Sequence, residues 1–182
     1  MMSEDENRLV ELYQSYGKLI HAYCARRTTS SQAADAVSEV FLVAWRRIAD
    51  VPAGDAALPW LYAVAYRTLS HQWRAGRRSQ RLLTQIAGMA AIQPPEPDLV
   101  LVRREEDRLV LMAASRLRPV DREILRLTLW EGLPHAEVAS VLGINPDAMK
   151  QRAYRARKKL ASEYNKLSKD RQPPAALKGG GS

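Results

Sequence analysis

The chain has 182 residues, of which 46% are hydrophobic and 26% charged, and a formal net charge of +8. This composition is that of a globular chain and not of a disordered one, and no apolar run approaches the roughly 20 residues needed to span a bilayer. The positive charge favours a polyanionic partner, either nucleic acid or an acidic membrane surface.

The first half of the sequence has the apolar spacing of three helices. Apolar residues at three- and four-residue intervals predict a helix over 7–27, and the Thr-Thr-Ser-Ser cluster that follows offers caps for a second helix. The second helix has an apolar stripe made of Val37, Val40, Phe41, Ala44, Trp45 and Ile48. After a loop at 49–57, rich in small and turn-forming residues, a third helix is predicted over about 59–78. Its apolar side has Trp60, Leu61, Val64, Ala65 and Leu69.

A proline-rich segment separates the two halves of the chain. Residues 79–97 are weakly patterned and end in Gln-Pro-Pro-Glu-Pro, which cannot continue a helix. We assign them as a linker between a domain at 1–78 and a domain at 98–168, followed by a disordered tail at 169–182. The tail ends in Gly-Gly-Gly-Ser, which is typical of a flexible linker or a fusion remnant.

The second half also reads as helix. One helix is predicted over 98–117, with Leu109, Met112, Ala113 and Leu117 inward. Another begins at Pro119 and stops at Gly132, with Ile124, Leu125, Leu127 and Leu129 as its apolar residues. Because no strand pattern is visible, the predicted fold class is all-α, with two small helical domains joined by a flexible linker.

Residues 131–160 have the pattern of a helix-turn-helix. Gly143 supplies the left-handed turn, Asn145 caps the second helix, and Pro146 fits its first position. Met149, Ala153, Ala156 and Leu160 fall on one side of that helix, which we expect to be buried. Lys150, Gln151, Tyr154 and Arg155 then face outward, as in a helix that enters the major groove of DNA.

The charge of residues 145–169 agrees with a DNA-binding helix. They contain eight Lys or Arg and two acids, which gives +6. A solvated basic face on a structural helix is the alternative interpretation. The turn, the cap and the small buried residues together favour DNA binding over that alternative.

Three segments of the chain resemble, in their order and spacing, the motifs of one family. SSQAADAVSEVFLVAWRRI resembles the pattern Asp-x-x-Gln-Glu-x-Phe-x-x-Ala-Trp-Arg, and LPWLYAVAYRTLSHQWRAGRR resembles a Trp-Leu-x-x-Val-Ala-x-Asn helix with a basic end. ASRLRPVDREILRLTLWEGLPHAEVASVLGINPDAMKQRAYRARKKL resembles the family's region 4 nearly position by position. Over residues 7–165 the chain therefore resembles a bacterial RNA polymerase sigma factor of the extracytoplasmic-function (ECF) group of the sigma-70 family.

The resemblance implies a protein that docks on core RNA polymerase, places it on a promoter and helps to separate the DNA strands. The helix that matches Asp35, Ser38, Glu39 and Phe41 presents a surface to the coiled-coil clamp helices of the largest polymerase subunit. Asp35 and Glu39 share a helix face that suits a basic partner helix, whereas Phe41 and Trp45 are favoured as core residues. Ser38 stands where the family usually has Gln.

The loop at 49–57 and the third helix correspond to the part of the family that captures single-stranded DNA of the −10 element. Strand capture needs positive charge and planar surfaces for unstacked bases. The candidate residues are Trp60, Tyr66, Arg67, His71, Arg74, Arg77 and Arg78. For each aromatic residue, packing is the favoured role. Arg67 replaces an Asn of the family pattern and cannot reproduce the donor–acceptor pair of an amide.

In region 4 the family reads the −35 element at the positions that match Lys150, Gln151, Tyr154 and Arg155. Gln151 replaces the usual Ser and suits a bidentate contact to adenine. Arg152 and Arg157 are assigned to phosphate contacts, which affect affinity more than base choice. Members of this family are often inhibited by an anti-sigma factor, which makes one a possible partner.

Other classes of protein fit the sequence less well. A stand-alone helix-turn-helix regulator would not need the first three helices, and a membrane-surface protein would spread its basic residues along one long face. The three histidines lie far apart, and no Cys pair or Gly-rich phosphate loop is present, so we expect no enzyme, cofactor or metal site. The acidic amino terminus is not a secretory signal, and the single Cys24 permits no internal disulfide. We therefore expect a cytoplasmic protein without membrane insertion.

Overall fold

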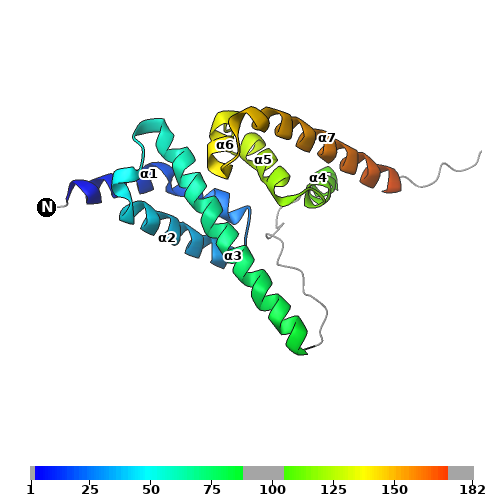
Figure 1. Ribbon diagram of the computed structural model, residues 1–182, viewed down its shortest axis with the longest axis horizontal. Coiled ribbons are helices and arrows are strands. Elements are labelled where there is room, and N and C mark those ends of the chain that lie inside the picture. The colour runs from blue at the N-terminus through cyan, green and yellow to red at the C-terminus, as the bar shows by residue number, and fades with distance from the viewer. Residues whose placement is uncertain (1–2, 88–104, 172–182) are drawn as a thin grey trace, which may run out of the picture. The chain divides into compact units, whose positions relative to one another are not determined.

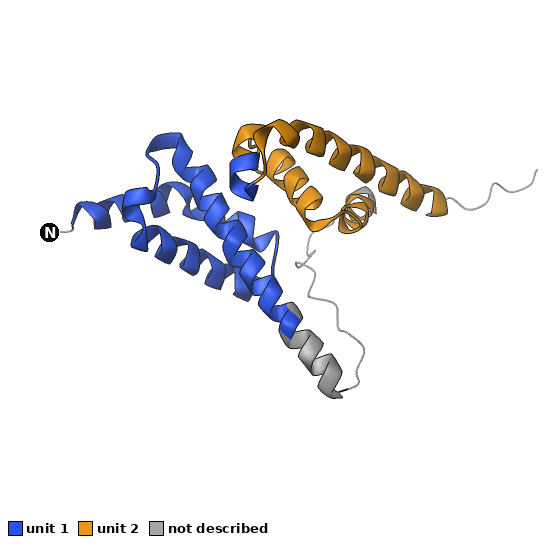
Figure 2. Ribbon diagram, in the orientation of Figure 1, with its two compact units in different colours: residues 1–100, 139–143 blue, residues 101–138, 144–182 orange. Residues whose placement is uncertain are grey.

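The structure is a computed structural model that describes residues 3–87 and 105–171, and both segments are helical (Figure 1). No strand occurs in either segment, which confirms the predicted all-α class. The chain divides into two compact units, one of residues 1–100 and 139–143, the other of residues 101–138 and 144–182 (Figure 2). We call them unit 1 and unit 2.

Unit 1 is built on three long helices that pack on one another pairwise. They are α1 (Glu4–Ala25), α2 (Ser30–Arg46) and α3 (Ala57–Ala87). Two short 3-10 turns, η1 (Ile48–Asp50) and η2 (Gly54–Ala56), lie between α2 and α3. The core residues are apolar and fully or almost fully buried, among them Ile20, Tyr23, Cys24, Val40, Leu61, Tyr62 and Leu69. The rings of Tyr23 and Tyr62 lie 5.0 Å apart between their centroids, so aromatic packing joins α1 to α3.

A capping box fixes the start of α1. The Ser3 hydroxyl accepts a hydrogen bond from the Glu6 amide at 3.2 Å, and the Glu6 carboxylate accepts one from the Ser3 amide at 2.7 Å. These bonds satisfy two amides that the first helical turn leaves without intrahelical partners. The helix therefore starts three residues before the predicted position.

Helix α3 is longer than the sequence predicted. It continues to Ala87, so residues 79–87, which we assigned to the linker, are helical. They contain neither Pro nor Gly, and the next residue is Gly88. Once a helix has formed, each added residue gains a hydrogen bond at little further entropic cost, so weak apolar patterning alone does not end it.

Unit 2 is organised around one long helix. Its helices are α4 (Glu105–Ser115), α5 (Pro119–Leu129), α6 (His135–Leu142) and α7 (Pro146–Arg171), and the division between the units runs through α6. Helices α4 and α5 both pack against α7. One apolar cluster joins Leu109 and Ala113 to Leu167, and another joins Leu117 and Leu125 to Ala156. Residues 98–104, the start of the helix predicted over 98–117, lie outside the described residues, as do residues 172–182 of the predicted tail. Residues 169–171, which we also assigned to the tail, are helical.

Arg122 stabilises the connection between α4 and α5. Its side chain donates hydrogen bonds to the backbone oxygen of Ala114 at 2.9 Å and to that of Leu117 at 3.3 Å. The last carbonyls of a helix have no intrahelical partner, and a guanidinium both satisfies them and complements the negative end of the helix dipole. A residue of α5 thus caps α4.

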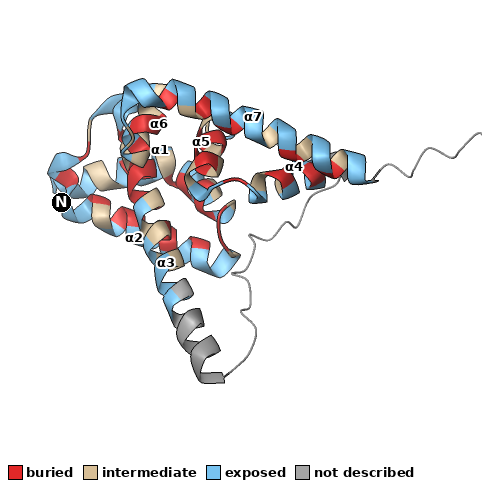
Figure 3. Cartoon of the chain, turned by 45° about the vertical axis from the view of Figure 1, so that its right-hand side comes forward, coloured by how far each residue is buried: buried red, intermediate tan, exposed pale blue. Residues whose placement is uncertain are grey.

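Burial differs between the two sides of each helix (Figure 3). In unit 2, two residues that we predicted to face inward are exposed: Met112 has 43% of its surface accessible and Leu129 has 59%. Met112 lies to one side of the face formed by Leu109 and Ala113, and Leu129 is the last residue of α5. None of the described helices combines the length and apolarity needed to cross a membrane.

Candidate functional site

Helix α2 turns one polar face to solvent. Asp35, Ser38 and Glu39 are all exposed, while Ala36, Val37 and Val40 are buried. The Ser38 hydroxyl donates to the backbone oxygen of Ala34 at 3.0 Å, so it is occupied within its own helix. The structure therefore brings the predicted acidic pair together on an accessible surface.

The two aromatic residues of α2 have different surroundings. Phe41 is 8% exposed and packs edge-on against Tyr13, with 4.9 Å between ring centroids. Trp45 is 40% exposed, so our assignment of it to the core is wrong. Trp45 lies on the flank of the apolar stripe, where a periodic pattern cannot distinguish a buried residue from an exposed one.

A shallow apolar groove of about 550 Å³ lies between α1 and α2. Its lining consists of Glu6, Leu9, Val10, Ser38, Phe41, Leu42 and Trp45. Val10 is 41% and Leu42 40% exposed. The sequence analysis did not predict Val10 and Leu42 as surface residues of a binding site. Each is an apolar residue that lies outside the buried stripe of its helix, and this position is the feature of the sequence that could have indicated them. The groove adjoins the acidic face, because Ser38 belongs to both.

Helix α3 carries a stripe of basic residues. Arg67, His71, Arg74 and Arg78 are exposed and recur at helical spacing, so they share one face. The Arg74 guanidinium donates to the backbone oxygen of Ser70 at 3.1 Å. Trp60 and Tyr66 are half-buried. The side chain of Arg77 lies outside the described residues.

The loop before α3 is tied to α1. The Arg8 side chain donates to the backbone oxygen of Val51, and the Tyr16 hydroxyl donates to that of Gly54 at 3.4 Å. Gly54 has a φ of +60°, a conformation that favours glycine. Residues of α1 and of this loop line a second hollow of about 640 Å³. The loop that precedes the basic stripe therefore has a fixed path.

The helix-turn-helix has the local geometry that the sequence predicts. Gly143 has a φ of +63°, and the Asn145 side chain accepts a hydrogen bond from the Asp147 amide at 2.8 Å. Met149, Ala153 and Ala156 are buried, as predicted for the inner side of α7, whereas Leu160 is only partly buried. On the outer side, Lys150, Gln151, Tyr154 and Arg155 are exposed.

The two arginines that we assigned to phosphate differ in their surroundings. Arg157 is exposed. Arg152 is half-buried, and its Nε lies 3.5 Å from a carboxylate oxygen of Asp121 on α5. The other oxygen of Asp121 accepts a hydrogen bond from Arg118 at 2.7 Å. Sequence reasoning did not find this contact, because it joins residues that lie far apart in the chain.

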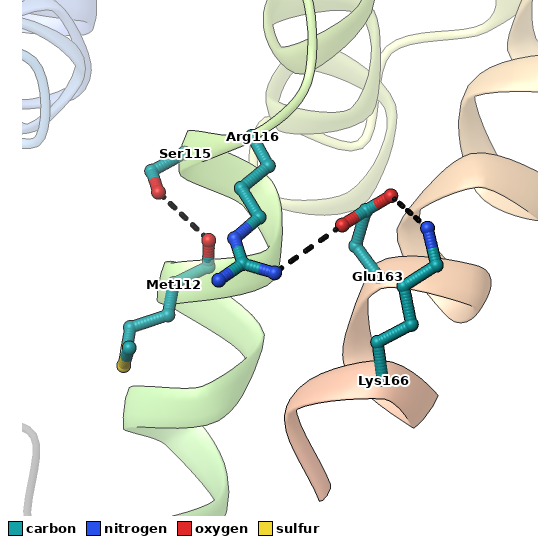
Figure 4. A network of polar contacts seen from close by, with 5 residues as sticks. All are labelled: Met112, Ser115, Arg116, Glu163 and Lys166. Carbon is teal, nitrogen blue, oxygen red and sulfur yellow. Dashed lines mark hydrogen bonds and ion pairs between the residues drawn. The ribbon is translucent and has the colours of Figure 1, made fainter. Parts of the chain in front are cut away.

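A second ionic contact fastens α4 to α7 (Figure 4). Glu163 accepts a hydrogen bond from Lys166 at 2.9 Å and lies 3.5 Å from a guanidinium nitrogen of Arg116. The hydrogen bond from Lys166 lowers the pKa of Glu163, while partial burial opposes that shift. Glu163 therefore stays ionised to a lower pH than a glutamate without these partners.

The described residues contain no cluster of three or more His, Cys, Asp or Glu side chains that could hold a metal ion. Cys24 is fully buried. The surfaces described above are acidic and apolar on α2 and basic on α3 and α7.

Two family models match the chain. Sigma-70 region 2 matches residues 12–79 and Sigma-70 region 4 matches residues 107–160, together more than half of the chain. The regions correspond to helices of unit 1 and of unit 2. The chain belongs to the sigma-70 family of RNA polymerase sigma factors. Within that family it is a member of the ECF group, to which named relatives belong.

The probable RNA polymerase sigma factor RfaY of Xanthomonas campestris pv. campestris is 33% identical over 82% of this chain, which spans 40% of that relative. The RNA polymerase sigma factor NccH of Alcaligenes xylosoxydans xylosoxydans is 28% identical, with 87% of each chain covered. The ECF RNA polymerase sigma factor BldN of Streptomyces coelicolor is 30% identical over 82% of this chain and 58% of its own length. The chain thus spans less than half of RfaY but most of NccH.

Solved structures share the fold. The sigma factor RpoE of Bartonella quintana, solved with the anti-sigma factor NepR, has a TM-score of 0.59 and 20% identity, covering 88% of this chain and 97% of its own. CnrH, solved with the cytosolic domain of CnrY, has a TM-score of 0.56 and 23% identity, covering 89% and 88%. At these identities the likeness concerns the fold alone.

Proposed function

We propose that this chain is a sigma factor that binds core RNA polymerase and directs transcription initiation at specific promoters, reading −10 and −35 elements and assisting strand opening. One observation carries the proposal: a helix-turn-helix with a basic outer face is joined in one chain to a helix with an acidic and apolar outer face. The basic face is suited to binding DNA, and the acidic and apolar face is suited to binding a protein. The chain acts by binding, without a catalytic residue or cofactor of its own.

Unit 1 supplies the polymerase contact. Asp35 and Glu39 attract basic residues of the clamp helices, while the neighbouring groove accepts apolar side chains. Phe41 forms a wall of that groove and is too buried to be a principal contact. Exposed Trp45 and Leu42 are better placed for that role, because a large aromatic side chain at the centre of an interface contributes most per residue.

Helix α3 captures the single-stranded −10 element. Its exposed arginines follow the phosphate backbone, and Trp60, Tyr66 and His71 offer planar faces for unstacked bases. We include Arg77 among the DNA-binding residues because it lies beside Arg78 in the basic end of this segment of the sequence. The Arg67 side chain has hydrogen-bond donors but no acceptor, whereas the Asn of the family pattern has both. We therefore expect Arg67 to contact a different base from the one that the Asn would hold.

Unit 2 reads the −35 element. Lys150, Gln151, Tyr154 and Arg155 form the exposed side of α7 and meet base edges in the major groove. Arg157 contacts phosphate. In this proposal residues 1–78 form the domain for polymerase and −10 DNA, residues 98–168 form the −35 domain, and 79–97 connect them, although the first part of that connection is helical.

The chain works in the cytoplasm, where core polymerase and promoter DNA are found. The solved structure of RpoE is a complex with the anti-sigma factor NepR. We extend this mode of regulation to the present chain, with the apolar groove of unit 1 as a surface that such an inhibitor would cover.

The direct test is run-off transcription with purified core polymerase, the full chain, and a library of promoters with randomised −10 and −35 positions. We expect transcripts from a subset of the library that shares both elements, and none from core polymerase alone. Absence of promoter-dependent transcripts, together with sequence-specific binding of duplex DNA without polymerase, would instead support a stand-alone regulator. That alternative is not favoured, because it leaves the match to region 2 unused.

A further inference from the structure

Asp121 lies between two arginines at the start of α5. It is 7% exposed, although it is a charged residue, and its two carboxylate oxygens point to different partners. One oxygen accepts from Arg118 Nε at 2.7 Å, within the same helix end. The other lies 3.5 Å from Arg152 Nε, on α7. Asp121 therefore links α5 to the DNA-reading helix.

The position of Arg152 on α7 explains this link. It lies three residues after Met149 and four before Ala156, both of which are buried, so it stands at the edge of the inner face. Its side chain is 37% exposed, whereas that of Arg118 is 76% exposed. Among the candidate DNA-binding residues of α7, Arg152 is the one whose charge is offset by an acid of another helix.

We propose that Asp121 is a positioning residue for −35 recognition, and that Arg152 is the strut through which it acts rather than a phosphate contact. The ion pair fixes the rotation of α7 about its own axis, and with it the direction in which Gln151 and Arg155 point. This inference rests on the proposed function, because it assigns a role within −35 readout. It replaces our assignment of Arg152 to phosphate.

Physical chemistry supports a strut over a phosphate contact. The Asp121 oxygen that faces Arg152 is buried and accepts no hydrogen bond, so moving Arg152 toward DNA leaves that oxygen without its ion-pair partner, which is unfavourable. Arg118 remains beside Asp121 but belongs to the same helix end, so it cannot orient α7. Base readout depends on placement to within a fraction of an ångström, which makes such a strut important for specificity.

The strut is tested first in the free protein, by thermal unfolding of Asp121→Asn, Arg152→Gln and the double variant. We expect each single variant to lower the Tm of unit 2 by a few degrees, and the double variant to lower it by clearly less than the sum. If the Tm shift of the double variant equals the sum of the two single shifts, Asp121 and Arg152 do not interact and the proposal is overturned. This arm needs neither polymerase nor DNA, so it gives an answer even if the proposed function fails.

The positioning role is tested with the full chain in polymerase holoenzyme, on promoters that differ by single −35 bases. At a temperature where all variants are folded, we expect Asp121→Asn and Arg152→Gln to reduce the ratio of cognate to mismatched activity by roughly tenfold. Arg118→Gln is the matched control, because it removes the other arginine of Asp121 without touching α7, and it should retain the ratio. Unchanged discrimination in Asp121→Asn would overturn the proposal, provided that the wild-type chain discriminates. A wild-type chain without −35 dependence would count against the proposed function instead.

The salt dependence of promoter binding separates strut from phosphate contact. Each phosphate contact contributes about 0.9 to the slope of log affinity against log salt. We expect Arg152→Gln to leave this slope unchanged and Arg157→Gln, on the exposed part of the same helix, to lower it by about one contact. A slope lowered by that amount in Arg152→Gln would overturn the proposal.

Discussion

Helices α2 and α7 have the same basic design but opposite outer faces. Each packs one side of small and apolar residues against its unit, with Ala36 and Val40 on α2 and Ala153 and Ala156 on α7. The outer side of α2 combines carboxylates with an exposed tryptophan, whereas that of α7 combines Lys and Arg with amide and phenol groups. The inner side of each helix builds the fold, and the outer side selects the partner.

This contrast shows why one chain needs both units. An acidic surface repels DNA phosphates, so α2 cannot be a duplex-binding helix, but an acidic rim around an apolar groove suits a basic amphipathic helix. The exposed face of α7 carries Lys and Arg side chains and suits a polyanion. The two kinds of contact can therefore be removed separately.

The largest loss of stability is expected from a substitution on the buried side of α7. Ala153 is fully buried, so Ala153→Arg inserts a large, unpaired charge into the core of unit 2 and destabilises it by on the order of 4 kcal/mol or more. Hydrogen exchange should show loss of protection in α4, α5 and α7 and retained protection in α1 to α3. Ala161→Arg, at an exposed position of the same helix, is the control and should behave like wild type. Equal loss of protection in α1 to α3 would show that the units do not fold separately.

A smaller effect is expected at the groove of unit 1. Trp45→Ala removes the largest exposed side chain of the groove and should weaken binding to core polymerase by about 2 kcal/mol, roughly 30-fold. Binding is measured by competition with the labelled wild-type chain. Leu19→Ala removes an exposed apolar residue that does not line the groove and is the matched control. If both variants bind core polymerase equally well, the groove is not part of the docking surface.

Arg155→Ala should weaken binding through the −35 element alone, by about 1–3 kcal/mol. Its exposed guanidinium lies on the outer face of α7, and the truncation leaves the buried side intact. Promoter binding by holoenzyme is measured on templates that vary one −35 base at a time. Lys169→Ala, an exposed cation near the end of α7, provides the control. Retained discrimination at every −35 base in Arg155→Ala would remove Arg155 from base readout.

The smallest effect concerns pH and the contact between α4 and α7. The hydrogen bond from Lys166 keeps the pKa of Glu163 below its ordinary value of 4.5. The stabilisation is therefore fully present above that pH and is lost as the pH falls through the lowered pKa. We expect wild type to be more stable than Glu163→Gln at neutral pH, and the two to converge in acid, as followed by denaturant unfolding of unit 2. A stability difference that persists unchanged well below pH 4.5 would contradict this role of Glu163.

Sequence patterns predicted the elements of this fold where local chemistry decides them. Asn145, Gly143 and the spacing of small residues fixed the register of α7, because caps and turns act over a few residues. Positions on the flank of an apolar stripe were not predictable in the same way: Trp45 is exposed because its burial depends on what packs beside the helix. The contact between Asp121 and Arg152 was beyond local pattern, since tertiary packing alone brings α5 and α7 together.

The separate roles of α2 and α7 are tested most directly by run-off transcription on a −35 variant library, with holoenzyme assembled from wild type, Glu39→Lys or Arg155→Ala. We predict that Glu39→Lys lowers transcription from every promoter in the same proportion and is rescued by excess protein, because it weakens the polymerase contact. Arg155→Ala should leave holoenzyme assembly intact and flatten the differences among −35 variants. If the two substitutions give the same pattern across the library, the division of labour between the two helices is wrong.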